Sequence, residues 1–205
     1  MEMSRRILSG GALVLCVALL AVGCAKPPQQ ELDGANAAMS EATQADAQNY
    51  AANEYARAQE AMNQVNAEME AQNAKFALIR SYNKTKELIA TANQAAADAK
   101  AAAVTGKETA RNESQAAIDA AKASLAAAQT AMTELEGCRR KPKGFSKDME
   151  MMKATWDGYN AQVAELDGAY SREDYNGAKA QAESLKAQAD TLVADLQAAK
   201  EKIKC

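Results

Sequence analysis

Apolar side chains recur along most of this chain in alternating steps of three and four residues. Five such stretches lie between about residue 31 and the C-terminus, separated by short polar or glycine-containing segments. This spacing puts the apolar side chains on one stripe of an α-helix, which is the seam along which helices pack lengthwise. The pattern therefore predicts an all-α protein, built of antiparallel helical hairpins that pack as a coiled-coil bundle.

The five predicted helices each have a seam of their own. Alanine is the commonest seam residue, and leucine, isoleucine, methionine and tyrosine supply most of the larger side chains. The predicted seams are Leu32, Ala35, Met39 and Ala42 in residues 31–48; Tyr55, Ala58, Met62, Val65 and Met69 in residues 53–71; Phe76, Ile79, Tyr82, Ile89, Ala92, Ala95, Ala96 and Ala99, then Ile118, Ala121, Leu125, Ala128, Met132 and Leu135 in residues 74–137; Met149, Met152, Trp156, Tyr159, Val163, Leu166 and Tyr170 after a cap at Ser146; and Tyr175, Ala178, Ala182, Leu185, Ala189, Leu192, Leu196, Ala199 and Ile203.

The third helix decides the architecture. If it is unbroken, the first two helices pack on its first half and the last two on its second half, giving two three-helix units that share one long central helix. Gly106 costs about 1 kcal/mol relative to alanine inside a helix, and Thr105 and Glu108 have the spacing of a capping box. A break there, which would fold the two halves together, stays open. The body accordingly divides into an N-terminal helical hairpin region, residues 31–105, and a C-terminal helical bundle, residues 106–205.

The start of the chain has a different pattern. A short basic segment leads into an apolar run over residues 7–22, which is shorter than the roughly 20 residues of a spanning helix. Small residues then precede Cys24 in the order Ala-Val-Gly-Cys, which resembles the bacterial lipobox. Residues 1–23 are therefore predicted to be a lipoprotein signal peptide, with lipid on Cys24 and a tether over residues 24–30. An ordinary secretory signal or a plain membrane anchor is the alternative.

Two further cysteines remain in the predicted mature chain. Cys138 and Cys205 form an even pair in an oxidising compartment, where a disulfide is the expected state. Their midpoint falls between Ser171 and Arg172, inside a predicted turn, so an antiparallel hairpin folded there brings them to the same height. Two unpaired thiols, or a bridge between chains through Cys205, are the other possibilities.

Composition narrows the possible functions. The chain has a net charge of −3 and no histidine, and aromatic residues make up 4% of it. A mildly acidic chain has no electrostatic footprint for nucleic acid. The commonest general base and metal ligand is missing, and no phosphate-binding loop, paired CxxC or nucleophile elbow is present. We therefore expect no enzyme activity, no cofactor, no metal and no nucleic-acid partner.

One cluster of cations is a candidate contact surface. Arg139, Arg140, Lys141 and Lys143 lie together with Pro142 between the third and fourth predicted helices. The cluster is a possible contact for an anionic envelope component. The alternative is a solvated loop whose cations complement the end of a helix, and this alternative is the more frequent case.

The segment YAANEYARAQEA, from Tyr50 to Ala61, is followed by Phe76 and a long alanine-rich helix. Over about residues 35–105 the chain resembles a family of alanine-rich bacterial envelope lipoproteins catalogued as domain of unknown function forty-three ninety-eight. The resemblance implies an envelope lipoprotein built of helical hairpins, and it implies no activity.

These observations predict a non-enzymatic, lipid-anchored protein of the cell envelope that acts as a helical scaffold, spacer or interaction module in the periplasm. Ala25, not aspartate, follows the predicted lipidation site, and by resemblance to known lipoprotein sorting signals this favours the outer membrane, facing the periplasm, as the expected location. The expected partners are the membrane, through lipid on Cys24, and an envelope protein or the cell wall. A periplasmic helical module that binds a peptide, lipid or cell-wall component is the alternative, and homo-oligomerisation is open because heptad seams also pack between chains.

Overall fold

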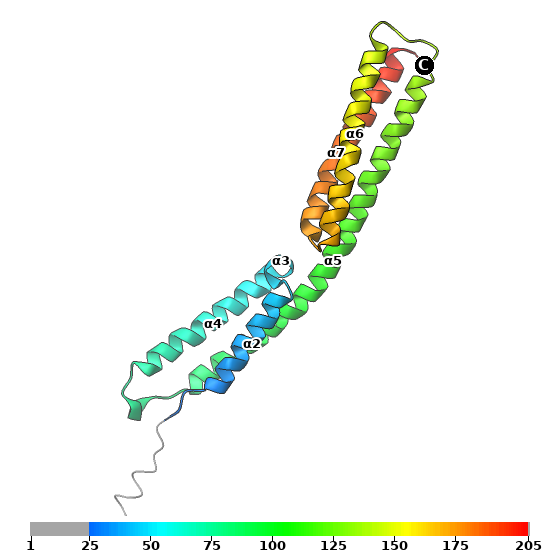
Figure 1. Cartoon of the computed structure of the whole chain (residues 1–205). Coiled ribbons are helices and arrows are strands. Elements are labelled where there is room, and N and C mark those ends of the chain that lie inside the picture. Colours follow the sequence, from blue (N-terminus) through cyan, green and yellow to red (C-terminus); the bar gives the residue numbers. More distant parts are fainter. Residues whose placement is uncertain (1–24, 205) are drawn as a thin grey trace, which may run out of the picture. The chain divides into compact units, whose positions relative to one another are not determined.

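A computed structural model describes residues 25–204 of the chain. Within this range all regular secondary structure is helical, so the prediction of an all-α bundle is confirmed (Figure 1). The elements are α2 (Gln29–Gln44), α3 (Ala47–Tyr50), α4 (Ala52–Asn73), the 3₁₀-helix η2 (Ala77–Ile79), α5 (Asn83–Glu136), α6 (Phe145–Ser171) and α7 (Tyr175–Lys202).

The described residues begin just after the predicted lipidation site. The signal peptide over residues 1–23, Cys24 and the C-terminal Cys205 all lie outside the described residues, so these predictions stay predictions. Helix α2 begins at Gln29, and Pro28 before it is buried. The last residues of the predicted tether, residues 24–30, therefore belong to the helical body.

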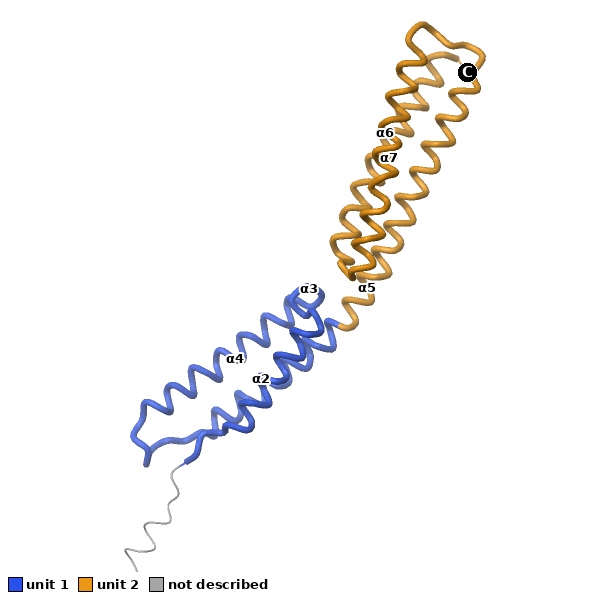
Figure 2. The backbone as a smooth tube through the Cα atoms, viewed as in Figure 1, with its two compact units in different colours: residues 1–103 blue, residues 104–205 orange. Residues whose placement is uncertain are grey.

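Helix α5 runs through Gly106 without a break. The chain divides into two compact units, residues 1–103 and 104–205, and α5 contributes its first part to unit 1 and its second part to unit 2 (Figure 2). Ala103 and Ala110 are buried on either side of Gly106. Packing on both sides outweighs the roughly 1 kcal/mol propensity cost of one glycine. Of the two arrangements that the sequence allows, two units sharing one helix is the one observed.

In unit 1, α2 runs parallel to α5 and α4 runs antiparallel to both. Two ion pairs, Glu31 with Lys86 (3.2 Å) and Glu41 with Lys100 (2.9 Å), join α2 to α5 in ascending order. The core has two parts. One contains the larger side chains Met62, Val65 and Ile89, and in the other every buried residue is alanine. The buried alanines of that second part are Ala42, Ala47, Ala51, Ala58, Ala96, Ala99 and Ala103.

The predicted first helix, residues 31–48, is wrong at its C-terminal end. Helix α2 stops at Gln44, and Asp46 takes the left-handed conformation (φ 60°) before the single turn of α3. Aspartate is among the few residues that visit this region at modest cost. The hydroxyl of Tyr55 bonds with Thr43 Oγ1 (3.0 Å) and accepts from Gln48 Nε2 (3.1 Å), which holds the turn against α4.

The predicted third helix begins too early. Residues 74–82 form a connection containing η2, and α5 starts only at Asn83. Phe76 and Ile79, predicted to lie in the seam, are instead 70% and 68% exposed. Their spacing of three is helical, but no facing helix covers this segment.

In unit 2, α5 and α7 run parallel in constant register. Four side-chain pairs join the two helices, and each pair is separated by 66 residues in the sequence. They are Lys107 with Glu173 (2.6 Å), Glu113 with Lys179 (2.8 Å), Ser124 with Asp190 (2.6 Å) and Glu134 with Lys200 (2.8 Å). Helix α6 runs antiparallel to both, and the indole N–H of Trp156 donates to Leu125 O (2.9 Å). The long leucine and isoleucine side chains of the predicted seams are buried between these helices.

The turn between α6 and α7 is where the sequence placed it, but its cap is a different residue. Asp174 Oδ1 accepts from Gly177 N (3.0 Å) and caps α7, whereas the hydroxyl of Ser171 donates back to Asp167 O inside α6. At the start of α6, Gly144 rather than Ser146 is the N-cap, in a left-handed conformation (φ 93°). The predicted cap at Ser146 is therefore wrong.

Candidate functional site

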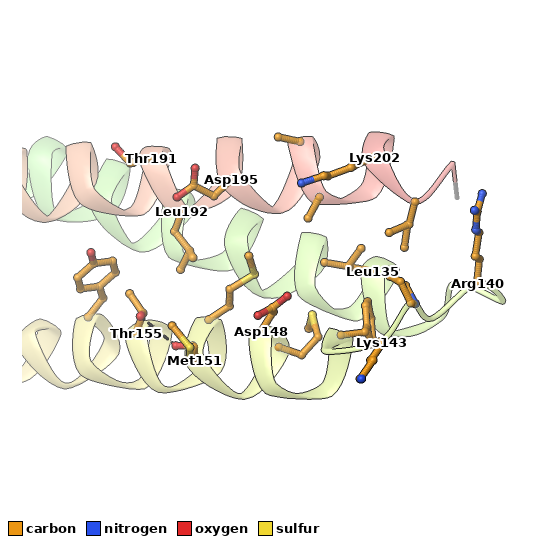
Figure 3. A pocket seen from close by; sticks show the side chains of 18 of the residues that line it. Leu135, Arg140, Lys143, Asp148, Met151, Thr155, Thr191, Leu192, Asp195 and Lys202 are labelled. Atoms are coloured by element: carbon orange, nitrogen blue, oxygen red, sulfur yellow. Dashed lines mark hydrogen bonds between the residues drawn. The ribbon is translucent and has the colours of Figure 1, made fainter.

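A cleft of about 870 Å³ lies in unit 2 between α6 and α7, close to the loop that connects α5 to α6 (Figure 3). Its volume is in the range of sites that hold small ligands. Leu135, near the end of α5, lies between the other two helices in the same view. The large apolar side chains that line the cleft are Leu135, Phe145, Met149, Met151, Met152, Tyr159, Leu192 and Ile203.

Methionine gives this lining an adaptable surface. Met149 is buried, Met152 is half-buried, and Met151 is 61% exposed. An unbranched, polarisable side chain can fill irregular space and fit ligands of different shape. Met149 and Met152 fit the steps of the helix seam, and they do belong to a core cluster or pack against it. Met151, which falls outside the steps of three and four, was the available sign of a further apolar surface.

Charged side chains surround the apolar lining. Arg140 and Lys143 come from the α5–α6 loop and Lys202 from the end of α7, while Asp148 and Asp195 come from α6 and α7. Three cations and two carboxylates leave the cleft with a small positive excess. Such a surface suits an apolar ligand that carries an anionic group.

The structure divides the predicted basic cluster into two parts. Arg140 and Lys143 line the cleft, whereas Arg139 and Lys141 are not among its lining residues. Lys141 instead places its ammonium 5.7 Å from the centre of the Phe145 ring, within the range of a cation–π contact. All four side chains are exposed. Anion binding by the cluster stays a prediction, and only two of its members face the cleft.

Cys138 is disulfide-bonded, and its partner cysteine is not among the described residues. Cys138 is buried in the same cluster as Ile203, so the chain end immediately before Cys205 is beside it. The constant register of α5 and α7 places Glu134 against Lys200, and the same register brings residue 138 to the last residues of the chain. These contacts favour the predicted bond between Cys138 and Cys205, which stays a prediction because Cys205 lies outside the described residues.

The other notable electrostatic groups join helices. The hydrogen bond with Glu113 raises the pKa of Lys179 above its ordinary 10.5. Hydrogen bonds from Lys186 and, with a smaller effect, from Ser124 lower the pKa of Asp190 below its ordinary 3.8. The Asp190 contacts stabilise the fold above pH 3.8, and this stabilisation is lost as the pH falls through the native pKa. The Lys179 contact stabilises the fold below pH 10.5 and is lost as the pH rises through its native pKa. Asp190 is exposed and Lys179 is only half-buried, so each contact makes a small contribution to the stability of the fold.

Residues 25–204 contain no group of three or more acidic, cysteine or histidine side chains placed to hold a metal ion. Among the same residues, no helix has the combined length and apolar character needed to cross a bilayer. Comparisons of the chain with family models, with curated proteins and with solved structures find no match. The resemblance over residues 35–105 to a family of envelope lipoproteins therefore stays a prediction.

Proposed function

We propose that the protein is a non-enzymatic lipoprotein of the cell envelope, anchored through lipid on Cys24, whose helical units act as a scaffold or interaction module on the periplasmic side of the outer membrane. The observation that carries the proposal is the order of residues 1–24, a basic start, an apolar run and small residues directly before a cysteine. The described body supports it because its first buried residue, Pro28, follows that cysteine closely.

Replacing Cys24 with serine is expected to abolish incorporation of lipid, because no other acceptor occupies the predicted cleavage site. Metabolic labelling of cells with an alkyne analogue of palmitate measures this directly. Cys16→Ser is the matched control, since Cys16 lies within the predicted signal peptide and should leave the label unchanged. Wild-type protein without label, or equal label on the Cys24→Ser variant, would contradict the proposal.

A scaffold also requires a partner, which we propose to be an envelope protein or the cell wall. Surface lysines are distributed over both units, so an amine-reactive crosslinker applied to intact cells can capture neighbours of either unit. Identification of the same envelope neighbour in repeated experiments supports the scaffold role. Recovery of the chain alone from intact cells would contradict it.

The cleft in unit 2 favours a second candidate function, the binding of an amphipathic ligand. Its apolar floor and its cations at Arg140, Lys143 and Lys202 would take the acyl chain and the carboxylate of a fatty acid. Trp156 is the only tryptophan of the chain and packs against the same core cluster as Tyr159, which lines the cleft. Its fluorescence is therefore a suitable signal for occupancy.

For the cleft we predict that Arg140→Ala with Lys143→Ala weakens binding of palmitate about tenfold, a loss that corresponds to about 1.4 kcal/mol. Titration of the purified mature protein, followed by Trp156 fluorescence, measures the effect. The matched control is Arg139→Ala with Lys147→Ala, which removes the same charge from two nearby exposed residues that do not line the cleft. Equal weakening in both double variants, or no saturable binding by the wild type, would rule out a carboxylate site at this rim.

A further inference from the structure

Three large apolar side chains are exposed side by side in the connection between α4 and α5. Phe76, Leu78 and Ile79 are 70%, 69% and 68% exposed, and they are the most exposed of the large apolar residues in the described chain. A single exposed apolar residue is ordinary, but adjacent ones form a patch that indicates contact with something apolar. We call residues 75–80 the apolar tip.

The base of the apolar tip is held by hydrogen bonds, so its side chains are presented by an ordered loop. Arg80 is central to this, because its guanidinium reaches back across the loop to two backbone carbonyls. The bonds are Arg80 Nε to Lys75 O (2.9 Å), Arg80 Nη2 to Asn73 O (2.8 Å), Ser81 N to Gln72 Oε1 (3.1 Å), Tyr82 Oη to Asn73 Oδ1 (2.9 Å) and Gln72 Nε2 to Glu68 Oε1 (2.7 Å). Gln72 and Tyr82 are buried, whereas the apolar side chains between them are exposed.

The apolar tip lies at the same end of unit 1 as the start of α2. Glu31, in the first turn of α2, pairs with Lys86 in the first turn of α5, directly after the tip (Figure 1). Pro28 is buried, so only a few residues separate Cys24 from the body of unit 1. Four extended residues reach at most about 14 Å. A lipid on Cys24 therefore keeps the membrane surface close to this end of unit 1.

The charged residues of the apolar tip itself are both cations. Residues 71–86 contain the four cations Lys75, Arg80, Lys84 and Lys86 and no acidic residue. Lys84 and Lys86 are paired with Glu68 and Glu31, while Lys75 and Arg80 lie in the tip itself. An apolar patch flanked by cations is the combination that binds the interface of a bilayer with anionic lipids.

From these observations we infer that the apolar tip inserts into the surface of the membrane that holds Cys24, with Phe76, Leu78 and Ile79 among the lipid head groups and upper acyl chains. The inference rests on the proposed lipid anchor for its orientation. The tip is then a second attachment point, which restricts how unit 1 can turn on its tether. The exposed ammonium of Lys75 contacts the anionic head groups, while Arg80 holds the loop.

The test uses Leu78→Trp in the mature chain from Ala25, with an N-terminal hexahistidine tag that replaces the lipid. The chain itself has no histidine, so the tag alone attaches it to vesicles of phosphatidylethanolamine, phosphatidylglycerol and a nickel-chelating lipid. Val104→Trp is the matched control, because Val104 is 58% exposed on α5, away from the tip. Both variants keep Trp156 as a common background.

On vesicles we expect the fluorescence of the tryptophan introduced by Leu78→Trp to shift to the blue. We also expect most of this fluorescence to be quenched when the lipids have bromine on their acyl chains. The emission of Val104→Trp should do neither. Equal quenching of the two variants would overturn the inference. A blue shift of Leu78→Trp in the absence of vesicles would also overturn it, because that result indicates that a second copy of the chain covers the tip.

The tag separates this inference from the proposed anchor. It attaches the chain at the correct end whatever happens at Cys24, so an unquenched tip rejects membrane insertion without bearing on lipidation. Absence of palmitate label on the wild-type protein would reject the lipid anchor, and it would leave open whether the tip enters lipid. A second check uses phosphatidylglycerol vesicles without the nickel-chelating lipid, to which the protein can bind only through its own surface. The double variant Phe76→Ser with Leu78→Ser should lose this weak binding, and unchanged binding would count against the inference.

Discussion

Replacing Cys138 with serine is expected to lower the free energy of unfolding of the mature protein by about 4 kcal/mol. A bond from Cys138 to Cys205 closes a loop that contains all of α6 and α7, and in the chain-entropy model a loop of this length restricts the unfolded chain by about that amount. This loss is a large share of the total free energy of unfolding of most domains, which is about 5–15 kcal/mol. Urea unfolding followed by circular dichroism measures the difference.

Reduction of the wild type supplies the control for this prediction. Cys138 is buried, so serine there also removes packing, whereas a reductant breaks the bond and leaves every side chain in place. We expect reduced wild type and Cys205→Ser to lose similar stability, and Cys138→Ser to lose slightly more. A Cys205→Ser variant as stable as the oxidised wild type would show that Cys138 has another partner.

Replacing Ala58 with leucine is expected to destabilise unit 1 by about 3 kcal/mol. Ala58 is fully buried in a cluster whose other buried members are all alanine, with the partly buried Met39 and Tyr55 packed against it. The buried contacts there are made by alanine methyl groups, so a leucine side chain finds no space at this position and must push the helices apart. Overpacking of this kind typically costs about 1–3 kcal/mol, and about the upper value is expected where the buried neighbours are too short to rearrange.

Ala56→Leu is the matched control for this prediction, since Ala56 is exposed two residues earlier on the same helix. It adds the same side chain at the same helix propensity and should change stability by less than about 0.5 kcal/mol. Thermal unfolding by circular dichroism compares the two variants. If the Ala58→Leu variant is as stable as the Ala56→Leu variant, the claim that α2, α4 and α5 pack tightly around Ala58 is contradicted.

Seam periodicity predicted most of the core correctly. From Ile118 to Leu135 and from Tyr175 to Leu196, nearly every seam position is buried, because one stripe of a helix must face the other two helices of its unit. The spacing could not say where a seam ends. Phe76 and Ile79 fit the helical step as well as Tyr82 does, yet only Tyr82 lies where another helix covers it.

Local signals were weaker predictors than periodicity. Gly106 and the capping-box spacing of Thr105 and Glu108 indicated a possible break, but α5 continues because units 1 and 2 both pack on it. Asp46 interrupts the first predicted helix without a glycine or proline to mark the position. A helix-propensity cost of about 1 kcal/mol at one residue can be outweighed by tertiary packing, and a sequence pattern does not specify that packing.

The candidate site was predicted only in part. The sequence singled out the cations of residues 139–143, and Arg140 and Lys143 do line the cleft. The apolar part of the cleft was not predicted, because Met149 and Leu192 are seam residues and a seam residue near the open end of a bundle looks the same in sequence as one inside it. Met151, outside the seam, was the residue that distinguished the two cases.

The lipid anchor is the central claim, because the proposed location and the orientation of the apolar tip both depend on it. The most direct measurement is the mass of the N-terminal tryptic peptide of the protein extracted from cell membranes. Lys26 is followed by proline, so this peptide extends from Cys24 to Arg57. We predict that it begins at Cys24 and has the added mass of acyl chains. A peptide that begins elsewhere, or one that has an unmodified thiol at Cys24, would contradict the account.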